Sequence, residues 1–296
     1  MSARNEARLA QAKILIAGCG DLGSRLAHRL GAVSTATILG LRRTPDATLA
    51  MPSNFQWISG DLTRESTLTQ LPHDFTHIVF AAAPNARTPA DYEAVYLHGL
   101  QHVIQACASS TLKRIVFISS TAVYGDHGDQ WVDENTPTEP AHFNGKTLCA
   151  AEQWLQAYGV KHHVETLSLR LSGIYGPGRH FLLDRLRLGQ ASAPLGAAHW
   201  ANRIHVEDAA AAIAHLLTLN QPDSTYLVTD STPLPMRTLY EALAKIVGGP
   251  CPPVGPAPAM VGSKRLSNNR LLATGFELRW PDSREGYAAS LTEQNT

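Results

Sequence analysis

Residues 13–24 read KILIAGCGDLGS, and this short stretch decides the fold. Its first five residues form an apolar run of strand length, and its last four begin a stretch with the apolar spacing of a helix. Between the two, Gly18, Gly20 and Gly23 match the spacing G-x-G-x-x-G. A buried strand that passes through such glycines into a helix is typical of the first turn of a dinucleotide-binding α/β domain.

Each glycine of this turn has a separate physical task. Gly18 is expected to make the sharp turn, Gly20 to let the backbone approach a diphosphate, and Gly23 to let the helix pack closely on the strand. The amides at the start of the helix, and the positive end of its dipole, would then face the anion. We therefore predict that these glycines bind a dinucleotide together with Asp21 and Leu22; the alternative is an ordinary glycine turn.

The same alternation continues through the first half of the chain. Further apolar strands are predicted at 35–41, 55–58, 76–82 and 114–119, with a helix at 92–109 between the last two. Continuous apolar strands separated by helical stretches indicate a parallel sheet covered on both faces. The fold class is therefore α/β, with a doubly wound parallel sheet of the Rossmann type.

The end of the second predicted strand bears on the choice of cofactor. Sites for NAD usually place an acidic residue there, to accept a hydrogen bond from the ribose 2′-hydroxyl. This chain has Arg42 and Arg43 instead, and guanidinium groups can bind a 2′-phosphate bidentately. We therefore predict NADP, with NAD as the second choice. The alternative is that both arginines belong to a solvated strand end.

The remaining predicted cofactor contacts also follow strands. Asp61 and Leu62 come after the third strand, where the carboxylate could accept from an adenine amino group or cap a helix that starts near Thr63. Three more residues, which end the fourth and fifth strands, complete the set: Ala81, Ala82 and Ser119.

After residue 170 the alternation of strand and helix loosens. Residues 1–170 are predicted to form the NAD(P)-binding Rossmann domain. Residues 171–296 are predicted to form mainly a small C-terminal substrate lobe, with some elements, among them a helix at 206–219 and a strand at 225–228, returning to the first domain.

Composition limits the partners that the chain can have. Its 25 basic and 25 acidic side chains balance, so charge recruits neither nucleic acid nor an anionic membrane. The first residues lack the apolar core of a signal peptide, and no apolar run approaches the roughly 20 residues that span a bilayer. We expect a cytoplasmic protein whose partner is a small-molecule substrate.

Several segments resemble the extended short-chain dehydrogenases, which form the NAD-dependent epimerase/dehydratase family. Residues 119–125 read SSTAVYG and resemble the family's S-S-x-x-V-Y-G segment. Residues 169–178 read LRLSGIYGPG and are similar to R-x-x-x-x-Y-G-P-G, and residues 202–208 read NRIHVED, similar to a segment that opens a late helix. The resemblance covers nearly the whole chain in the right order. It implies hydride transfer to or from nucleotide sugars or related carbonyl and alcohol substrates.

The resemblance breaks where the family carries its Tyr-x-x-x-Lys pair. Residues 144–152 read NGKTLCAAE, so Asn144 stands at the tyrosine position and Leu148 at the lysine position. An amide has no useful pKa and leucine is apolar, so neither side chain can exchange a proton. Lys146 comes two residues before Leu148, so its side chain is expected to lie about 200° around the helix from the lysine position. Tyr96 stands where relatives have an asparagine on the preceding helix.

The catalytic residues implied by the resemblance are therefore incomplete. Ser120, four residues before Tyr124, corresponds to the side chain that hydrogen-bonds the reacting oxygen in the family. Tyr124 is the second predicted catalytic residue. Tyr175, His205, the substrate or water are the other candidates for proton transfer, and no metal is expected.

Two functions remain after this comparison of motifs. An NAD(P)-dependent oxidoreductase or epimerase with non-standard acid/base residues is favoured, because the fold signature and Ser120 are present. The alternative is a non-catalytic NADP(H)-binding sensor or regulatory protein. Residues 263–271 read SKRLSNNRL, and similar segments belong to lobe packing in relatives, so no chemistry is assigned to them. The resemblance also implies a homodimer.

Overall fold

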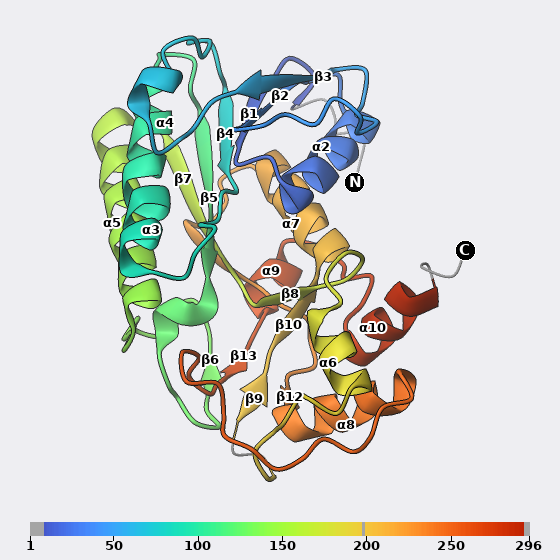
Figure 1. The fold of residues 1–296 in the computed structure, drawn as a ribbon. Coiled ribbons are helices and arrows are strands. Elements are labelled where there is room, and N and C mark those ends of the chain that lie inside the picture. Colours follow the sequence, from blue (N-terminus) through green and yellow to red (C-terminus); the bar gives the residue numbers. More distant parts are fainter. Residues whose placement is uncertain (1–8, 197–198, 293–296) are drawn as a thin grey trace. The chain divides into compact units, whose positions relative to one another are not determined.

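The computed structural model describes residues 9–196 and 199–292 of the chain. Its largest feature is a seven-stranded sheet with the strand order β11-β7-β5-β4-β1-β2-β3 (Figure 1). The strands are β1 (Lys13–Ala17), β2 (Thr37–Arg42), β3 (Phe55–Ser59), β4 (His77–Phe80), β5 (Arg114–Ser120), β7 (Glu165–Leu171) and β11 (Thr225–Val228). β1 pairs in parallel with β2 and β4, as do β2 with β3 and β4 with β5. The predicted α/β fold with a Rossmann-type parallel sheet is confirmed.

The strands form because their side chains are apolar on both faces. Ile14, Leu15 and Ile16 are fully buried, and so are Ile78 and Val79 on the neighbouring strand. Helices cover both faces of this sheet: α4 (Leu100–Ala106) and α5 (Phe143–His162) lie on one, and α2 (Asp21–Val33) lies on the other (Figure 1). A strand enclosed in this way needs no polar face, which is why the sequence shows continuous apolar runs.

One predicted helix differs from the structure. The stretch expected as a single helix at 92–109 begins with the last residue of α3 (Pro89–Tyr92) and contains two further elements, the π-helical η2 (Glu93–Gly99) and α4. α3 begins with Thr88 as its N-cap, because the Thr88 hydroxyl accepts from the Asp91 N–H. Tyr96 lies in the π-helical turn η2. Apolar periodicity alone does not distinguish such a turn from an α-helix.

The chain divides into two units by its internal contacts. Unit 1 comprises Met1–Ser120, Lys146–Arg170 and Ala210–Tyr226, and unit 2 comprises Thr121–Gly145, Leu171–Ala209 and Leu227–Thr296. Unit 1 holds most of the sheet. It includes Ala210–Tyr226 from the second half of the chain. The predicted division into 1–170 and 171–296 remains a prediction about domains.

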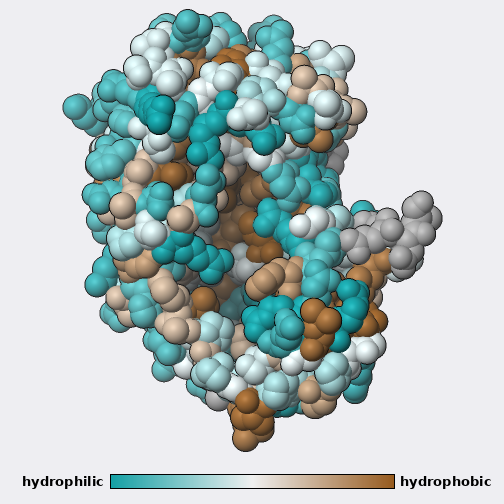
Figure 2. Space-filling model, viewed as in Figure 1, coloured by the Kyte–Doolittle hydropathy of each residue, from teal (hydrophilic) through white to brown (hydrophobic). Residues whose placement is uncertain are grey.

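Unit 2 is made of short strands and helices. They are η3 (Thr121–Tyr124), β6 (Trp131–Val132), β8 (Gly173–Tyr175), α6 (Phe181–Arg187), β9 (Trp200–Ala201), β10 (Arg203–His205), the start of α7 (Val206–Thr218), β12 (Leu234–Pro235), α8 (Met236–Ile246), β13 (Arg265–Leu266), α9 (Asn269–Ala273) and α10 (Ser283–Thr292). Its core gathers Leu183, Leu186, Leu239 and Leu243 from α6 and α8. Hydrophobic residues also reach the surface near these two helices (Figure 2).

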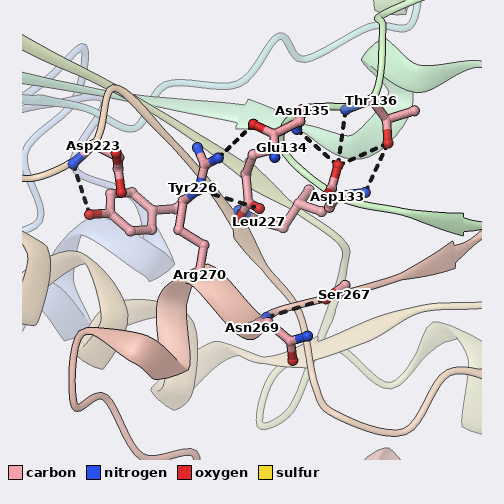
Figure 3. Close-up of polar contacts among 10 residues, drawn as sticks. All are labelled: Asp133, Glu134, Asn135, Thr136, Asp223, Tyr226, Leu227, Ser267, Asn269 and Arg270. Atoms are coloured by element: carbon pink, nitrogen blue, oxygen red, sulfur yellow. Dashed lines mark hydrogen bonds and ion pairs between the residues drawn. The ribbon is translucent and has the colours of Figure 1, made fainter.

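Within unit 2, a buried carboxylate pairs with the edge strand of the sheet. The Glu134 Oε1 atom accepts a 2.7 Å hydrogen bond from the N–H of Leu227 on β11. Arg270 of α9 lies beside it, with Nε 3.7 Å from Glu134 Oε2 and Nη2 2.8 Å from the Asn135 side-chain oxygen (Figure 3). A strand edge presents unpaired amides, and Glu134 occupies one of them.

Candidate functional site

The glycine turn after β1 has the geometry that its sequence predicts. Gly18 has a φ of +79°, and an added Cβ would overlap the Cα of Ala82. The Gly18 and Cys19 amides both donate to the carbonyl of Leu41, at 3.0 and 2.9 Å. Gly18 is therefore required both by its backbone conformation and by the close approach of the segment after β4.

The other two glycines of the turn, Gly20 and Gly23, differ in how closely other atoms approach them. Gly20 precedes the first residue of α2, and a Cβ placed on it would meet nothing nearer than the Gly18 carbonyl at 4.0 Å. A Cβ on Gly23 would lie 3.0 Å from Ile16 Cγ2, so this glycine allows α2 to pack against β1. The space beside Gly20 is therefore not filled by the protein, whereas the space beside Gly23 is taken up by the packing of α2 against β1. An open backbone at a helix start fits a diphosphate, because the helix dipole favours an anion there.

Asp21 is the acidic residue in the first turn of α2. Its carboxylate accepts a 2.7 Å hydrogen bond from Arg25 Nε, one helical turn further on. The charge of Asp21 is therefore compensated by a neighbour on the same helix. Leu22 beside it is buried. The residues of this turn consequently fit a bound dinucleotide, whose phosphates they would hold.

The two predicted arginines stand where β2 ends. Arg42 is its last residue, and its guanidinium carbon lies 5.7 Å from the centre of the Trp57 ring. Arg43 Nη2 donates a 3.1 Å hydrogen bond to the Asn85 side-chain oxygen. Both guanidiniums therefore have contacts that hold them at the carboxyl end of the sheet. A cation stacked on an aromatic ring remains able to hydrogen-bond an anion at its edge.

Asp61 follows β3 and interacts electrostatically with Arg43. Its carboxylate accepts from the Thr63 N–H and hydroxyl at 3.0 and 2.7 Å. Burial works to raise the pKa of Asp61, but the Thr63 hydrogen bonds, Arg43 and Arg64 together hold it below its usual value. The helical turn that follows, η1 (Glu65–Thr67), has Arg64 as its N-cap, so the contact with Thr63 closes a local turn rather than capping a helix. The adenine role of Asp61 stays a prediction.

The predicted alanines meet the glycine turn within unit 1. The Ala81 N–H donates to the Ala17 carbonyl at 2.8 Å, and Ala82 contacts Gly18. Leu62 fills the space that glycine leaves at Gly99. The sequence-predicted residues at the ends of β1 and β4 are thus brought together, as the carboxyl edge of a parallel sheet requires.

Ser119, near the end of β5, belongs to a buried polar triad. Its hydroxyl donates a 2.5 Å hydrogen bond to Glu152 Oε1 on α5. Arg170 of β7 binds the same carboxylate, with Nη2 2.7 Å from Oε2. Each side chain of the ion pair is 9% exposed. Ser119 therefore has a firm internal partner, and its predicted contact with a cofactor remains untested.

Ser120 follows Ser119 as the last residue of β5, and it is half-buried. Successive side chains of a strand point to opposite faces. Because the Ser119 side chain points toward Glu152 and Arg170, the Ser120 side chain points to the opposite face of the sheet. Ser120 is the residue predicted to contact the reacting oxygen. Glu152 ends the quoted 144–152 segment, and the sequence alone assigns it no role. Two charged residues within strongly apolar surroundings were the available signal.

The helix α5 carries Asn144 and Leu148, the residues that the motif resemblance aligns with the family's Tyr-x-x-x-Lys pair. Leu148 is buried, whereas Lys146 is exposed. Lys146 and Leu148 are two positions apart on the helix, so the two side chains point in different directions, as the helical period predicts. Burial raises the pKa of Tyr96 to about 12, and its ring packs against Phe117 and Tyr92. Tyr96 is consequently a poor proton donor at neutral pH.

The other tyrosine candidates lie in unit 2. Tyr124 is fully buried, and its carbonyl accepts a 2.7 Å hydrogen bond from His127 Nε2. Tyr175 is buried and stacks on Tyr287 with ring centres 4.1 Å apart, and burial raises the pKa of Tyr175 far above its usual value. Packing accounts for both rings. The catalytic role of Tyr124 therefore stays a prediction with a structural alternative.

His205 is packed in the same aromatic group. Its ring centre lies 3.7 Å from that of Trp280 and 5.1 Å from that of Tyr175. The Glu207 N–H donates to His205 Nδ1 at 3.2 Å, which leaves the proton of a neutral ring on Nε2, beside the Ser290 hydroxyl at 3.2 Å. This histidine is 1% exposed. It is a packed residue with both ring nitrogens engaged.

Among residues 9–196 and 199–292, no three or more His, Cys, Asp or Glu side chains gather in a way that could hold a metal ion. Over the same residues, every helix is too short or too polar to cross a bilayer.

Comparison with known proteins places this architecture. Residues 14–228 match the model of the NAD dependent epimerase/dehydratase family. The chain is 29% identical over 279 residues to Protein YeeZ of Escherichia coli K12, covering 91% of this chain and 97% of that protein. A solved structure from Methylobacillus flagellatus, provisionally assigned as an NAD-dependent epimerase/dehydratase, is 38% identical with a TM-score of 0.79, and the match covers 96% of this chain and 99% of that one.

A third relative carries a specific activity in its name. The 2′-dehydrokanamycin reductase of Streptomyces kanamyceticus is 26% identical over 272 residues, which cover 88% of this chain and 73% of that protein. The resemblance read from the motifs is therefore confirmed, and with it the expectation of an NAD(P)-type oxidoreductase fold. The chain belongs to the NAD-dependent epimerase/dehydratase family, a family of enzymes.

Proposed function

We propose that this chain is an NADP(H)-dependent oxidoreductase or epimerase that acts on a small carbonyl or alcohol compound, or on a sugar nucleotide. When bound, the cofactor supplies the hydride chemistry of its nicotinamide ring. The chain's own residues bind and orient: the Gly18–Gly23 turn holds the diphosphate, and Ser120 donates a hydrogen bond to the reacting oxygen. The named reductase among the relatives supports a carbonyl substrate.

The observation that carries the cofactor preference is the pair of arginines at the end of β2. Arg42 and Arg43 are held by Trp57 and Asn85, and no carboxylate follows β2 directly. The nearest acidic group from the next strand, Asp61, binds Thr63. An arginine pair at this position suits a 2′-phosphate and offers no acceptor for a free 2′-hydroxyl.

The experiment is a titration of purified protein with NADPH and with NADH. The variant Arg42→Ala/Arg43→Ala should weaken NADPH binding by at least about tenfold, or about 1.4 kcal/mol, and change NADH binding by less than about twofold. Arg187→Ala, an exposed arginine of α6, is the control for loss of one positive charge. Equal weakening of both cofactors would remove the 2′-phosphate role.

The acid/base step needs a separate test, because Leu148 is buried where relatives carry a lysine. We expect NADPH to be oxidised in the presence of compounds from a panel of simple ketones and keto-sugar nucleotides. The decrease in NADPH absorbance measures the rate. Ser120→Ala should lower the rate far more than it lowers cofactor affinity. Tight NADPH binding with no oxidation across the panel favours the second candidate, a non-catalytic NADP(H) sensor, which the Asn144 and Leu148 replacements motivate.

The cellular location and the oligomeric state of the protein are also proposals. A cytoplasmic location fits the balanced charge, and a homodimer is the assembly that the family resemblance suggests. Sedimentation of the purified chain tests the second point directly.

A further inference from the structure

Lys264 is a buried lysine in unit 2 for which the proposed function has no role yet. It directly precedes β13 and is 2% exposed. Its Nζ atom donates two hydrogen bonds of 2.9 Å, to the carbonyls of Gly125 and Gly262. Lysine is almost never buried to this extent without a specific set of acceptors. Here the recorded acceptors are backbone carbonyls of two separate segments.

These two segments are the 125–130 loop and the 262–265 segment, and they lie against each other along their length. An added Cβ on Gly262 would overlap the Gly125 carbonyl, so only glycine permits the approach. The Ser263 carbonyl accepts from the His127 N–H, and the Ser263 hydroxyl donates to the Gly128 carbonyl, each at 2.8 Å. Lys264 therefore sits at the first of several successive links between them.

The far end of the contact is equally well defined. The Arg265 N–H donates to the Gln130 carbonyl at 2.9 Å, and β13 then pairs in parallel with β6. The Arg265 guanidinium carbon lies 5.1 Å from the ring centres of both Trp131 and Trp200. Trp131 follows the 125–130 loop directly, and its side chain reports on the position of that loop.

The 125–130 loop has a functional position in the chain. β5 ends at Ser120, and the chain then runs through η3 to Gly125, whose φ is +69°. In open parallel sheets, ligands bind where the strands end at their carboxyl side. The 125–130 loop therefore belongs to the segment that continues from the carboxyl end of β5, five residues beyond Ser120 along the chain. Its conformation is set by the 262–265 segment, from the other end of the chain.

We propose that Lys264 is a positioning residue, whose ammonium group fixes the 125–130 loop, which follows β5 along the chain, in the conformation that the proposed reaction requires. The proposal rests on the proposed function, because it concerns the same reaction. It assigns chemistry to the SKRLSNNRL segment, in which the lysine supplies a charge that two carbonyls share. A charge-assisted hydrogen bond is roughly twice as strong as a neutral one, so the proton on Lys264 matters to the contact.

The charges around Lys264 make this proton sensitive to pH. Burial lowers the pKa of Lys264 to about 8, and Asp126 of the 125–130 loop opposes that effect. His199, before β9, is itself buried, and its pKa is lowered first by burial and then by Lys264. His127, Asp129 and Arg265 are the other charged or titratable side chains of the 125–130 loop and the 262–265 segment. Below pH 8 the ammonium is present, and above it the contact with the two carbonyls weakens.

The test uses full-length protein with Lys264→Met and Lys264→Arg, and with Lys245→Met, an exposed lysine at the end of α8, as the matched control. The first readout is tryptophan fluorescence between pH 6.5 and 9.5. Wild type and the Lys245 variant should show a step near pH 8 that Trp131→Phe reduces. The step should be absent in Lys264→Met and should leave this range in Lys264→Arg. A step that stays near pH 8 in either Lys264 variant overturns the proposal.

The second readout is NADPH oxidation with the best carbonyl compound of the panel described above. Lys264→Met should bind NADPH within about twofold of wild type and lose at least about tenfold in kcat. Lys264→Arg should keep more activity and lose the decline above pH 8. A kcat of Lys264→Met within twofold of wild type at every pH overturns the positioning role.

Circular dichroism establishes that each variant is folded. If Lys264→Met does not fold, the Lys264→Arg profile decides both readouts. Failure of the two proposals remains distinguishable. Absence of NADPH binding or turnover in wild type and in Lys245→Met removes the proposed function and the positioning role together. An active wild type with an unaffected Lys264→Met removes the positioning role alone.

Discussion

The Ser119 hydroxyl donates a 2.5 Å hydrogen bond to the Glu152 carboxylate, which also binds Arg170. This contact joins β5 to α5, the helix that the motif resemblance aligns with the family's tyrosine and lysine. Glu152 is the polar residue one turn beyond Leu148 along the same helix face. The serine pair at the end of β5 is therefore held by a charged partner rather than by apolar packing alone.

Removal of the Glu152 charge should be costly. Glu152→Gln leaves the Arg170 guanidinium buried without its counter-ion, and breaking one partner of a buried pair costs about 3–5 kcal/mol. Urea unfolding measures the loss. Asp184→Asn, in the exposed pair with Arg187, is the control and should cost less than about 1 kcal/mol. A Glu152→Gln protein as stable as wild type would show that the pair contributes nothing.

The glycine turn provides a matched pair of variants. Gly20→Ala should leave stability almost unchanged, because its Cβ would meet no atom nearer than 4.0 Å. It should nevertheless weaken NADPH binding by at least about tenfold, since the methyl group would stand where the diphosphate approaches the backbone. Gly18→Ala should destabilise the fold itself, because of its φ of +79° and the overlap with Ala82.

Calorimetric titration and thermal unfolding separate these two effects. An unchanged NADPH affinity in Gly20→Ala would mean that the cofactor does not approach this turn. A Gly18→Ala protein with the stability of wild type would contradict the packing of the turn against Ala82.

The sheet could be predicted from the sequence because its strands are local patterns. The strand expected at 225–228 coincides with β11 residue for residue. The sequence predicts one helix at 92–109 because apolar periodicity does not identify a π-helical turn such as the one at Glu93–Gly99. The glycine turn was equally accessible, since G-x-G-x-x-G carries its geometry in adjacent residues.

The polar partners could not be predicted in this way. Ser119 and Glu152 are 33 residues apart, and Lys264 and Gly125 are 139 apart. Periodicity indicates which residues are buried, but it does not identify the group that a buried charge contacts. The role of Lys264 was therefore missed although its segment was singled out. A lysine within a segment that packs a lobe was the available signal.

The contact between Glu134 and the edge strand predicts a graded series. Glu134→Gln keeps an oxygen for the Leu227 N–H and loses only the attraction to Arg270, so it should cost about 1 kcal/mol. Glu134→Ala leaves that amide without its acceptor and should cost about 2–3 kcal/mol. Urea unfolding gives the order, and hydrogen exchange at the Leu227 amide should accelerate in Glu134→Ala. Equal stability of both variants would contradict the edge-covering role (Figure 3).

Asp230 is a buried acid in unit 2 with an unusual balance of forces. Its side chain is 1% exposed, and neither carboxylate oxygen has a regular hydrogen bond among the described residues. Burial raises the pKa of Asp230 to about 8, and Asp282 adds to the rise, whereas Ser283, the Thr232 amide and Arg203 offset part of it. Contacts with Ser283 and Thr232 lower the pKa without meeting full hydrogen-bond geometry, so desolvation dominates.

The raised pKa makes stability depend on pH in a defined direction. Between about pH 4 and 8 the folded state holds a proton on Asp230 that the unfolded state releases, so stability should fall as pH rises through this window. Asp230→Asn cannot release that proton, and its advantage over wild type should grow with pH to a few kcal/mol near pH 8, since one pKa unit corresponds to about 1.4 kcal/mol. Urea unfolding at intervals of pH, with Asp184→Asn as the exposed control, measures the difference. A difference between Asp230→Asn and wild type that stays constant from pH 5 to 8.5 would mean that Asp230 is ionised in the folded protein.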